Sequence, residues 1–158
     1  MKLLPIVALL FATSSHAAEP CEARIQSAFA RVKPRAVAII PALQASTWYF
    51  KWFMSDDFIA QTRPRVLDIE VNKSQMCQRA DSEIEAVIAH EFGHLISRTL
   101  NNEHMLTKAG QEDYANYYAA RLVPDSSEYL SILDNRCIKG NMYFCEAAKA
   151  WRMGIVAP

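Results

Sequence analysis

The chain has 158 residues, of which 51% are hydrophobic and 22% are charged, and its formal net charge is zero. This length is enough for one globular domain with a hydrophobic core, and the composition is too apolar for a disordered chain. A zero net charge excludes a global field that would recruit nucleic acid or an anionic membrane. We therefore expect a single folded domain whose function depends on a local site.

Residues 1–17 are interpreted as an export signal rather than as part of the fold. A basic residue is followed by an apolar run over 3–12, and Ser15 and Ala17 fit a small-x-small cleavage site after Ala17 or one residue later. About ten apolar residues cannot span a bilayer, which requires roughly 20. The mature chain, 18–158, is expected to form one domain with no membrane span.

The four cysteines all lie in the expected mature chain. An even number of cysteines in an exported protein suggests two disulfides, and four cysteines allow three pairings. We favour Cys137–Cys145, which closes a short loop, and Cys21–Cys77, which ties the first mature residues to the segment before a long predicted helix. The alternative of a cysteine metal site lacks a Cys-x-x-Cys pair. These features predict a periplasmic or secreted protein.

The N-terminal half predicts a helix followed by strands. Residues 21–33 have apolar side chains at helical spacing, and the helix is expected to stop before Pro34. Three segments are expected to be strands, because they are rich in β-branched or aromatic residues or alternate between apolar and charged ones: 36–43, 47–53 and 66–71. Pro41 suggests that the first of them is an edge strand or ends early.

The C-terminal half predicts helices. The segment "DSEIEAVIAHEFGHLISRTLNN" has apolar residues at helical spacing, with Ser82 and Glu85 at the spacing of a capping box and Asn101 as a plausible end. Three further helices are expected at roughly Lys108–Leu122, Ser126–Asn135 and Cys145–Met153. The order of helix, strands and helices predicts an α+β domain.

The pattern "HEFGH" within the long predicted helix is typical of a metal site. On a helix, His90 and His94 differ by about 40° in azimuth and about 6 Å in rise, so both rings can reach one ion. Glu91 lies beside this pair, where its carboxylate could reach a water molecule rather than the metal. Two histidine ligands and a glutamate general base are the roles that His-Glu-x-x-His assigns.

A catalytic zinc ion uses three protein ligands and leaves a fourth position open. His104 is one candidate, but Ser97 and Leu100 stand where a metzincin has glycine and histidine. Glu112 in "GQEDYANYYAARLVP" is favoured, because small residues on its face of the predicted helix would let the two helices approach closely. Asn116, one turn further on, could accept the ring N–H of a ligand histidine.

The two motifs together resemble the gluzincin metallopeptidases, and they are most similar to the ImmA/IrrE-like group. The second motif of that group has the form Glu-x-x-Ala-Asn-x-aromatic-Ala-x-x-Leu-x-x-Pro. This chain matches it from Glu112 to Leu122, with Pro124 one residue early. The resemblance covers residues 82–124. Its departure is the export signal, since that group is associated with cytoplasmic proteins, and this leaves the substrate open.

The resemblance implies a fold, a cofactor and a ligand set. The expected fold is a small zincin-like α+β domain with an N-terminal helix, a short, mostly antiparallel sheet, an active-site helix and C-terminal helices. One zinc ion per chain would be bound by His90, His94 and Glu112, with Glu91 as the catalytic base. By the same resemblance, the strand at 66–71 is expected to be the sheet edge along which the substrate lies.

These expectations predict zinc-dependent hydrolysis of peptide bonds outside the cytoplasm, with a peptide or protein as substrate. Glu91 would accept the proton of the attacking water and pass it to the leaving amine. One alternative is a zinc amidase that acts on cell-wall peptides. Another is a binding protein that keeps the zincin fold without catalysis, although a binding protein would not need a base at position 91.

Overall fold

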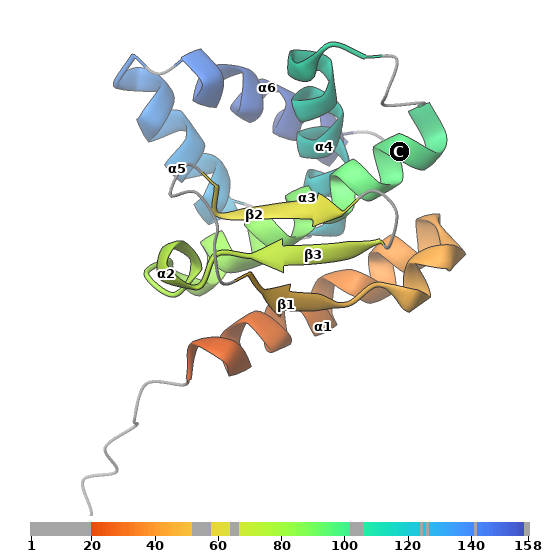
Figure 1. Ribbon diagram of the computed structural model, residues 1–158. Coiled ribbons are helices and arrows are strands. Elements are labelled where there is room, and N and C mark those ends of the chain that lie inside the picture. Colours follow the sequence, from red (N-terminus) through yellow and green to blue (C-terminus); the bar gives the residue numbers. More distant parts are fainter. Residues whose placement is uncertain are drawn as a thin grey trace, which may run out of the picture.

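The computed structural model describes residues 20–51, 58–63, 67–101, 106–123, 125, 127–140 and 142–156. It has a mixed α+β architecture, in which a small three-stranded sheet lies against helix α3 (Figure 1). The expected signal segment at 1–17 lies outside the described residues, as does His104. Within the described part of the chain, every helix is too short or too polar to cross a membrane.

Helix α1 spans Cys21–Ile39 and continues past Pro34, where the sequence predicts that it should stop. A proline inside a helix removes one backbone hydrogen bond. Ala36, two residues further on, is fully buried, and packing of this kind holds the helix together beyond the proline. The predicted strand at 36–43 is therefore wrong. Its first residues complete α1, and the rest form most of the 3-10 helix η1, Pro41–Ala45.

The sheet has the spatial order β1-β3-β2, with bounds Trp48–Phe50 for β1, Ala60–Arg63 for β2 and Asp68–Val71 for β3. Strand β3 pairs with β1 in parallel and with β2 in the antiparallel direction. The sheet is therefore mixed rather than mostly antiparallel. The strand expected at a sheet edge is instead the central one, so it has no edge to offer a substrate.

Two strand boundaries differ from the sequence prediction for identifiable reasons. Strand β3 begins at Asp68 rather than at residue 66, because Leu67 has a φ of 58°, in the left-handed region that a strand cannot adopt. Strand β2 was not predicted, because "AQTR" is short and lacks an apolar alternation. Its pairing with β3, and not its own composition, makes it a strand.

Helix α3, Asp81–Asn101, runs through the centre of the molecule and contacts α1, β2, α4 and α5 (Figure 1). The other helices that follow the sheet are α2 (Lys73–Met76), α4 (Lys108–Leu122), α5 (Ser127–Ile138) and α6 (Met142–Val156). Helix α4 has the predicted bounds, and α6 begins three residues earlier than predicted. Phe29 of α1 packs against Phe92 of α3, with ring centroids 5.3 Å apart, within the buried core.

The predicted capping box of α3 does not form. The helix begins at Asp81, so Ser82 lies inside it, and its buried hydroxyl has no hydrogen-bond partner among the described residues. Glu85 instead accepts a hydrogen bond of 2.7 Å from Arg31 of α1. The side chain that was expected to cap α3 therefore ties it to the neighbouring helix.

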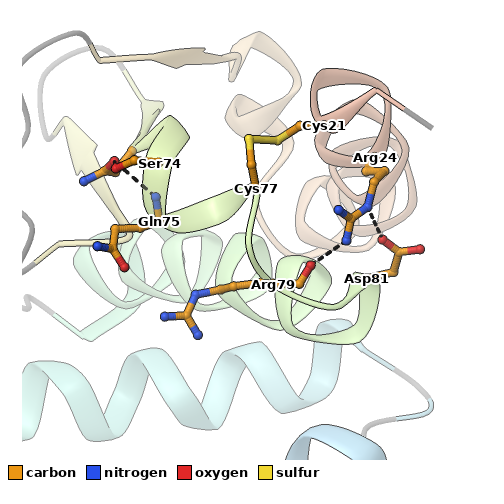
Figure 2. The surroundings of a disulfide bond; sticks show 8 residues. Cys21, Arg24, Ser74, Gln75, Cys77, Arg79 and Asp81 are labelled. Atoms are coloured by element: carbon orange, nitrogen blue, oxygen red, sulfur yellow. Dashed lines mark hydrogen bonds and ion pairs between the residues drawn. A yellow bond between two sulfur atoms is a disulfide. The ribbon is translucent and has the colours of Figure 1, made fainter. Parts of the chain in front are cut away.

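Both disulfides have the favoured pairing. Figure 2 shows that Cys21, at the start of α1, is bonded to Cys77, just before α3. Nearby, Arg24 donates one hydrogen bond to the Asp81 carboxylate at 2.6 Å and another to the backbone carbonyl of Arg79. The start of α1 is thus held to the start of α3 by one covalent bond and one ion pair. The second disulfide, Cys137–Cys145, joins the end of α5 to the first turn of α6.

The central strand carries a buried carboxylate with many donors. Glu70 is 4% exposed and accepts hydrogen bonds from Tyr49, Lys51 and Gln61, while Arg63 forms an ion pair with it at 3.1 Å. Burial by itself would raise the pKa of Glu70. The donated hydrogen bonds outweigh burial and lower the pKa from 4.5 to about 2. The ionised form of Glu70 therefore stabilises the sheet.

We expect Glu70→Gln to lower the free energy of unfolding at pH 7 by about 1–3 kcal/mol, because hydrogen bonds to a charged acceptor are lost. The difference in the free energy of unfolding between wild type and variant should be complete above pH about 4.5. It should decline as the pH falls towards about 2, because Glu70 stabilises the fold only while its carboxylate is ionised. Urea unfolding of both proteins across this range measures the difference.

Glu146→Gln is the control for the Glu70 experiment, because Glu146 is exposed and its ion pair with Lys149, at 3.6 Å, is largely solvated. Its stability should stay close to that of the wild type at every pH. A difference between wild type and Glu70→Gln that does not change with pH would show that the charge of Glu70 is not what stabilises the sheet.

Candidate metal centre

The two histidines of the "HEFGH" segment lie on one face of α3. His90 and His94 are separated by one helical turn, and their ring centroids are 4.8 Å apart with the rings nearly perpendicular. Both side chains are largely buried but not sealed from solvent. The helical spacing therefore brings the two rings together as the sequence predicts.

Glu112 of α4 completes a cluster of three ligand groups. Its Oε2 lies 3.3 Å from Nε2 of His90, and its Oε1 lies 3.7 Å from Nε2 of His94. One ligand atom from each residue can be chosen so that all three lie within 4.8 Å of one another. A tetrahedral zinc site with bonds of about 2.0–2.1 Å separates neighbouring ligand atoms by about 3.4 Å. The two separations measured from Glu112 are close to this value.

The close approach of α3 and α4 depends on Gly93, which lies between the histidines in sequence. A Cβ atom placed on Gly93 would lie 2.2 Å from the backbone oxygen of Ala115 in α4. Only a residue without a side chain permits this contact. The sequence predicts small residues on the α4 side of the contact, which the buried Ala115 and Ala119 confirm, but it gave no reason to select Gly93.

Asn116 orients the first histidine. Its Oδ1 lies 3.1 Å from Nδ1 of His90, and since an amide oxygen can only accept, Nδ1 is the protonated nitrogen of the ring. The other nitrogen, Nε2, is left to face Glu112. Contacts of this kind fix the tautomer and direction of a ligand histidine. The structure thus places Asn116 where the sequence predicted it.

Glu91 is 5% exposed, and its Oε2 has no hydrogen-bond partner among the described residues. Burial raises the pKa of Glu91, and the charges of His90 and His94 offset only part of this effect. A buried carboxylate oxygen without a partner is costly, and a water molecule or an ion commonly satisfies such a group. This oxygen is therefore available to a water molecule or an ion beside the two histidines.

The ligand groups also shift one another's pKa values. Burial would raise the pKa of Glu112, but the hydrogen bond and charge of His90 and the charge of His94 lower it from 4.5 to about 2. Burial would lower the pKa of His90, but its hydrogen bond with Glu112 and the charge of Glu91 raise it overall. The carboxylates thus favour a proton, and with it a positive charge, on the His90 ring. A bound cation would replace the proton, since imidazole binds metals in its neutral form.

Tyr143, from the first turn of α6, is a residue of the site that the sequence did not indicate. Its hydroxyl donates a hydrogen bond of 3.2 Å to Oε2 of Glu112. Partial loss of water around the hydroxyl and the nearby Glu112 carboxylate raise the pKa of Tyr143, so the phenol remains a donor. It was missed because the last helix was expected to begin at Cys145, and a tyrosine in a loop carries no signal of this contact.

A hollow of ≈ 400 Å³ lies between α4 and α6 beside the cluster. Glu112, Asn116 and Tyr143 form part of its wall. The third ligand candidate therefore borders open space on the side away from α3, and its carboxylate has room to move unless other groups hold it.

Comparison of this chain with protein-family models, with curated proteins and with solved structures finds no match. The resemblance to gluzincins therefore stays a prediction based on two short motifs. The ligand set of His90, His94 and Glu112 is supported instead by the geometry of the described residues.

We expect Gly93→Ala to destabilise the protein by about 1–3 kcal/mol or more, because the new methyl group would overlap the α4 backbone and force the helices apart. Gly110→Ala is the matched control. Its Cβ would meet nothing closer than 3.5 Å, and alanine in a helix is favoured by up to about 1 kcal/mol. Thermal unfolding of both variants tests the contact. Equal stability of the two would contradict it.

Proposed function

We propose that the protein is an exported, zinc-dependent metallopeptidase. The observation that carries the proposal is the convergence of His90, His94 and Glu112, with the buried Glu91 beside them, whose Oε2 has no hydrogen-bond partner among the described residues. Two disulfides and the absence of a spanning helix among the described residues are consistent with export.

The donor set supports zinc as the metal. Two imidazoles and one carboxylate are a ligand set that catalytic zinc sites use, with the fourth position left open for reaction. When bound, zinc would acidify a water molecule and polarise the carbonyl group of the substrate. His90 would bind through Nε2, the nitrogen that Asn116 leaves facing Glu112. Glu112 would supply an oxygen from the neighbouring helix.

Glu91 has the position and environment of a general base. It follows His90 directly on α3, so its side chain projects beside the ligands rather than between them. Its buried carboxylate would accept a proton from the attacking water and donate it to the leaving amine. Burial raises the basicity of this carboxylate relative to an exposed one, which suits that task.

A sheet edge in contact with the helix that carries the histidines supports an extended peptide as substrate. Among the described strands, β2 pairs with β3 alone and forms one edge of the sheet, on the side of α3 (Figure 1). Arg98, one turn beyond His94, donates a hydrogen bond of 2.8 Å to Thr62 of β2. A peptide that added to this edge would run close to the metal site. Strand β2 thus takes the role that the sequence analysis gave to residues 66–71.

We expect Glu112→Gln to weaken zinc binding strongly, because an amide oxygen is a poor substitute for a charged ligand. Asp113→Asn is the matched control, since the neighbouring carboxylate is exposed and lies outside the ligand cluster. Elemental analysis of the purified mature proteins after dialysis against trace zinc measures the effect. Full zinc content in Glu112→Gln would mean that another group is the third ligand, and the assignment would fail.

We expect Glu91→Gln to lower the rate of peptide hydrolysis by about 10²–10⁴, because the amide cannot accept the proton of the attacking water. Its zinc content and melting temperature should match those of the wild type. A peptide-library digest followed by mass spectrometry detects cleavage.

Wild-type protein that is zinc-loaded but cleaves only cell-wall peptides would indicate the amidase alternative. Zinc-loaded protein that cleaves neither substrate would indicate a binding protein.

A further inference from the structure

We propose that Tyr143 is a positioning residue of the metal centre. Its hydroxyl holds the carboxylate of Glu112 in the orientation that meets the histidines, and the Cys137–Cys145 disulfide holds Tyr143 within reach of Glu112. The inference rests on the proposed zinc site and goes beyond it, since it assigns a function to α6 and to one of the two disulfides.

The first argument is the geometry at one oxygen atom. Oε2 of Glu112 lies 3.2 Å from the Tyr143 hydroxyl and 3.3 Å from Nε2 of His90. The carboxylate is therefore held from two sides, by a donor on α6 and by a ring on α3. The other oxygen points towards His94 at 3.7 Å. With the hydroxyl removed, the histidine side alone would restrain the carboxylate among the contacts of the described residues.

The second argument is the space around Glu112. The side chain is 26% exposed and borders the ≈ 400 Å³ hollow between α4 and α6. A glutamate has several rotatable bonds, and fixing such a side chain costs conformational entropy. Tyr143 stands at the wall of the same hollow. Its hydrogen bond restricts movement of the carboxylate away from the histidines before any metal binds.

The third argument is how Tyr143 itself is held. The residue is 53% exposed, so burial in the core does not fix its position. It lies inside the loop closed by Cys137 and Cys145, whose Cα atoms are 4.7 Å apart. The turn within this loop contains Gly140 with a φ of 89°, a conformation that suits glycine. The position of Tyr143 therefore depends on the covalent link between α5 and α6.

A cation–π contact reinforces the same junction. The guanidinium of Arg136, near the end of α5, lies 4.9 Å from the ring centroid of Phe144 in the first turn of α6. The ring of Phe144 in turn packs edge-on against Tyr143, with centroids 5.4 Å apart. The disulfide holds the backbone of the first turn of α6, and the ring contacts hold the side chain of Tyr143. Together they position the hydroxyl that donates to Glu112.

The test measures zinc affinity by competition with a chromophoric chelator, so it does not depend on catalysis. Tyr143→Phe removes only the hydroxyl and should weaken zinc binding by about 10–100-fold, the range for loss of a group that orients a ligand. Tyr114→Phe removes the hydroxyl of an exposed tyrosine on α4 and should leave the affinity unchanged. The melting temperature of the zinc-free protein should be unaffected by either change.

The disulfide is tested in the same assay. Cys137→Ser with Cys145→Ser should weaken zinc binding, whereas Cys21→Ser with Cys77→Ser should lower stability but leave affinity near the wild-type value below the melting temperature. Addition of Tyr143→Phe to the first pair should cause little further loss, because both changes act through one hydrogen bond.

The outcomes separate this inference from the proposed function. Wild-type protein that binds no zinc would overturn both. If Tyr143→Phe binds zinc as tightly as the wild type, Tyr143 has no positioning role, and the metallopeptidase proposal is unaffected. Additive losses from the tyrosine and cysteine changes would show that the disulfide does not act through Tyr143.

Discussion

The contact on which the proposed metal centre depends is the backbone approach of α3 to α4 at Gly93. His90 and His94 are placed by their own helix, but Glu112 belongs to another, and its reach is limited by the separation of the two helix axes. The overlap that a single Cβ would create with Ala115 shows how little room that contact has. The glycine in the centre of "HEFGH" therefore lets the proposed ligands of the two helices meet.

Two buried glutamates show how the surroundings decide what a carboxylate can do. Glu70 and Glu91 are almost equally buried, at 4% and 5% exposure, yet their pKa values shift in opposite directions. Glu70 accepts several hydrogen bonds and ion pairs, so it is held ionised and stabilises the sheet. Glu91 has an oxygen without a partner among the described residues, which is compatible with its proposed role as a base. The extent of burial alone therefore does not distinguish Glu70 from Glu91.

The sequence predicted the parts of the molecule that are set by local periodicity. Helix α4 has its predicted bounds, and α3 brings the paired histidines to one face, because helical spacing acts within one segment. The sequence predictions were wrong where contacts with residues distant in the chain determine the secondary structure. Strand β2 exists because β3 pairs with it, and α1 passes Pro34 because Ala36 beyond it is buried. Tyr143 was missed for the same reason, since its contact joins α6 to α4 and no spacing reveals it.

The groups that form the site act at two levels. Gly93 and the alanines facing it set the distance between helices, so their replacement would damage the fold and the ligand cluster together. Asn116 and Tyr143 act on side chains that are already within reach, one by turning the His90 ring and the other by holding the Glu112 carboxylate. Each contributes one hydrogen bond to a ligand and little to the apolar core. A change at this second level should therefore alter the metal site while the fold persists, which is how the two contributions can be separated.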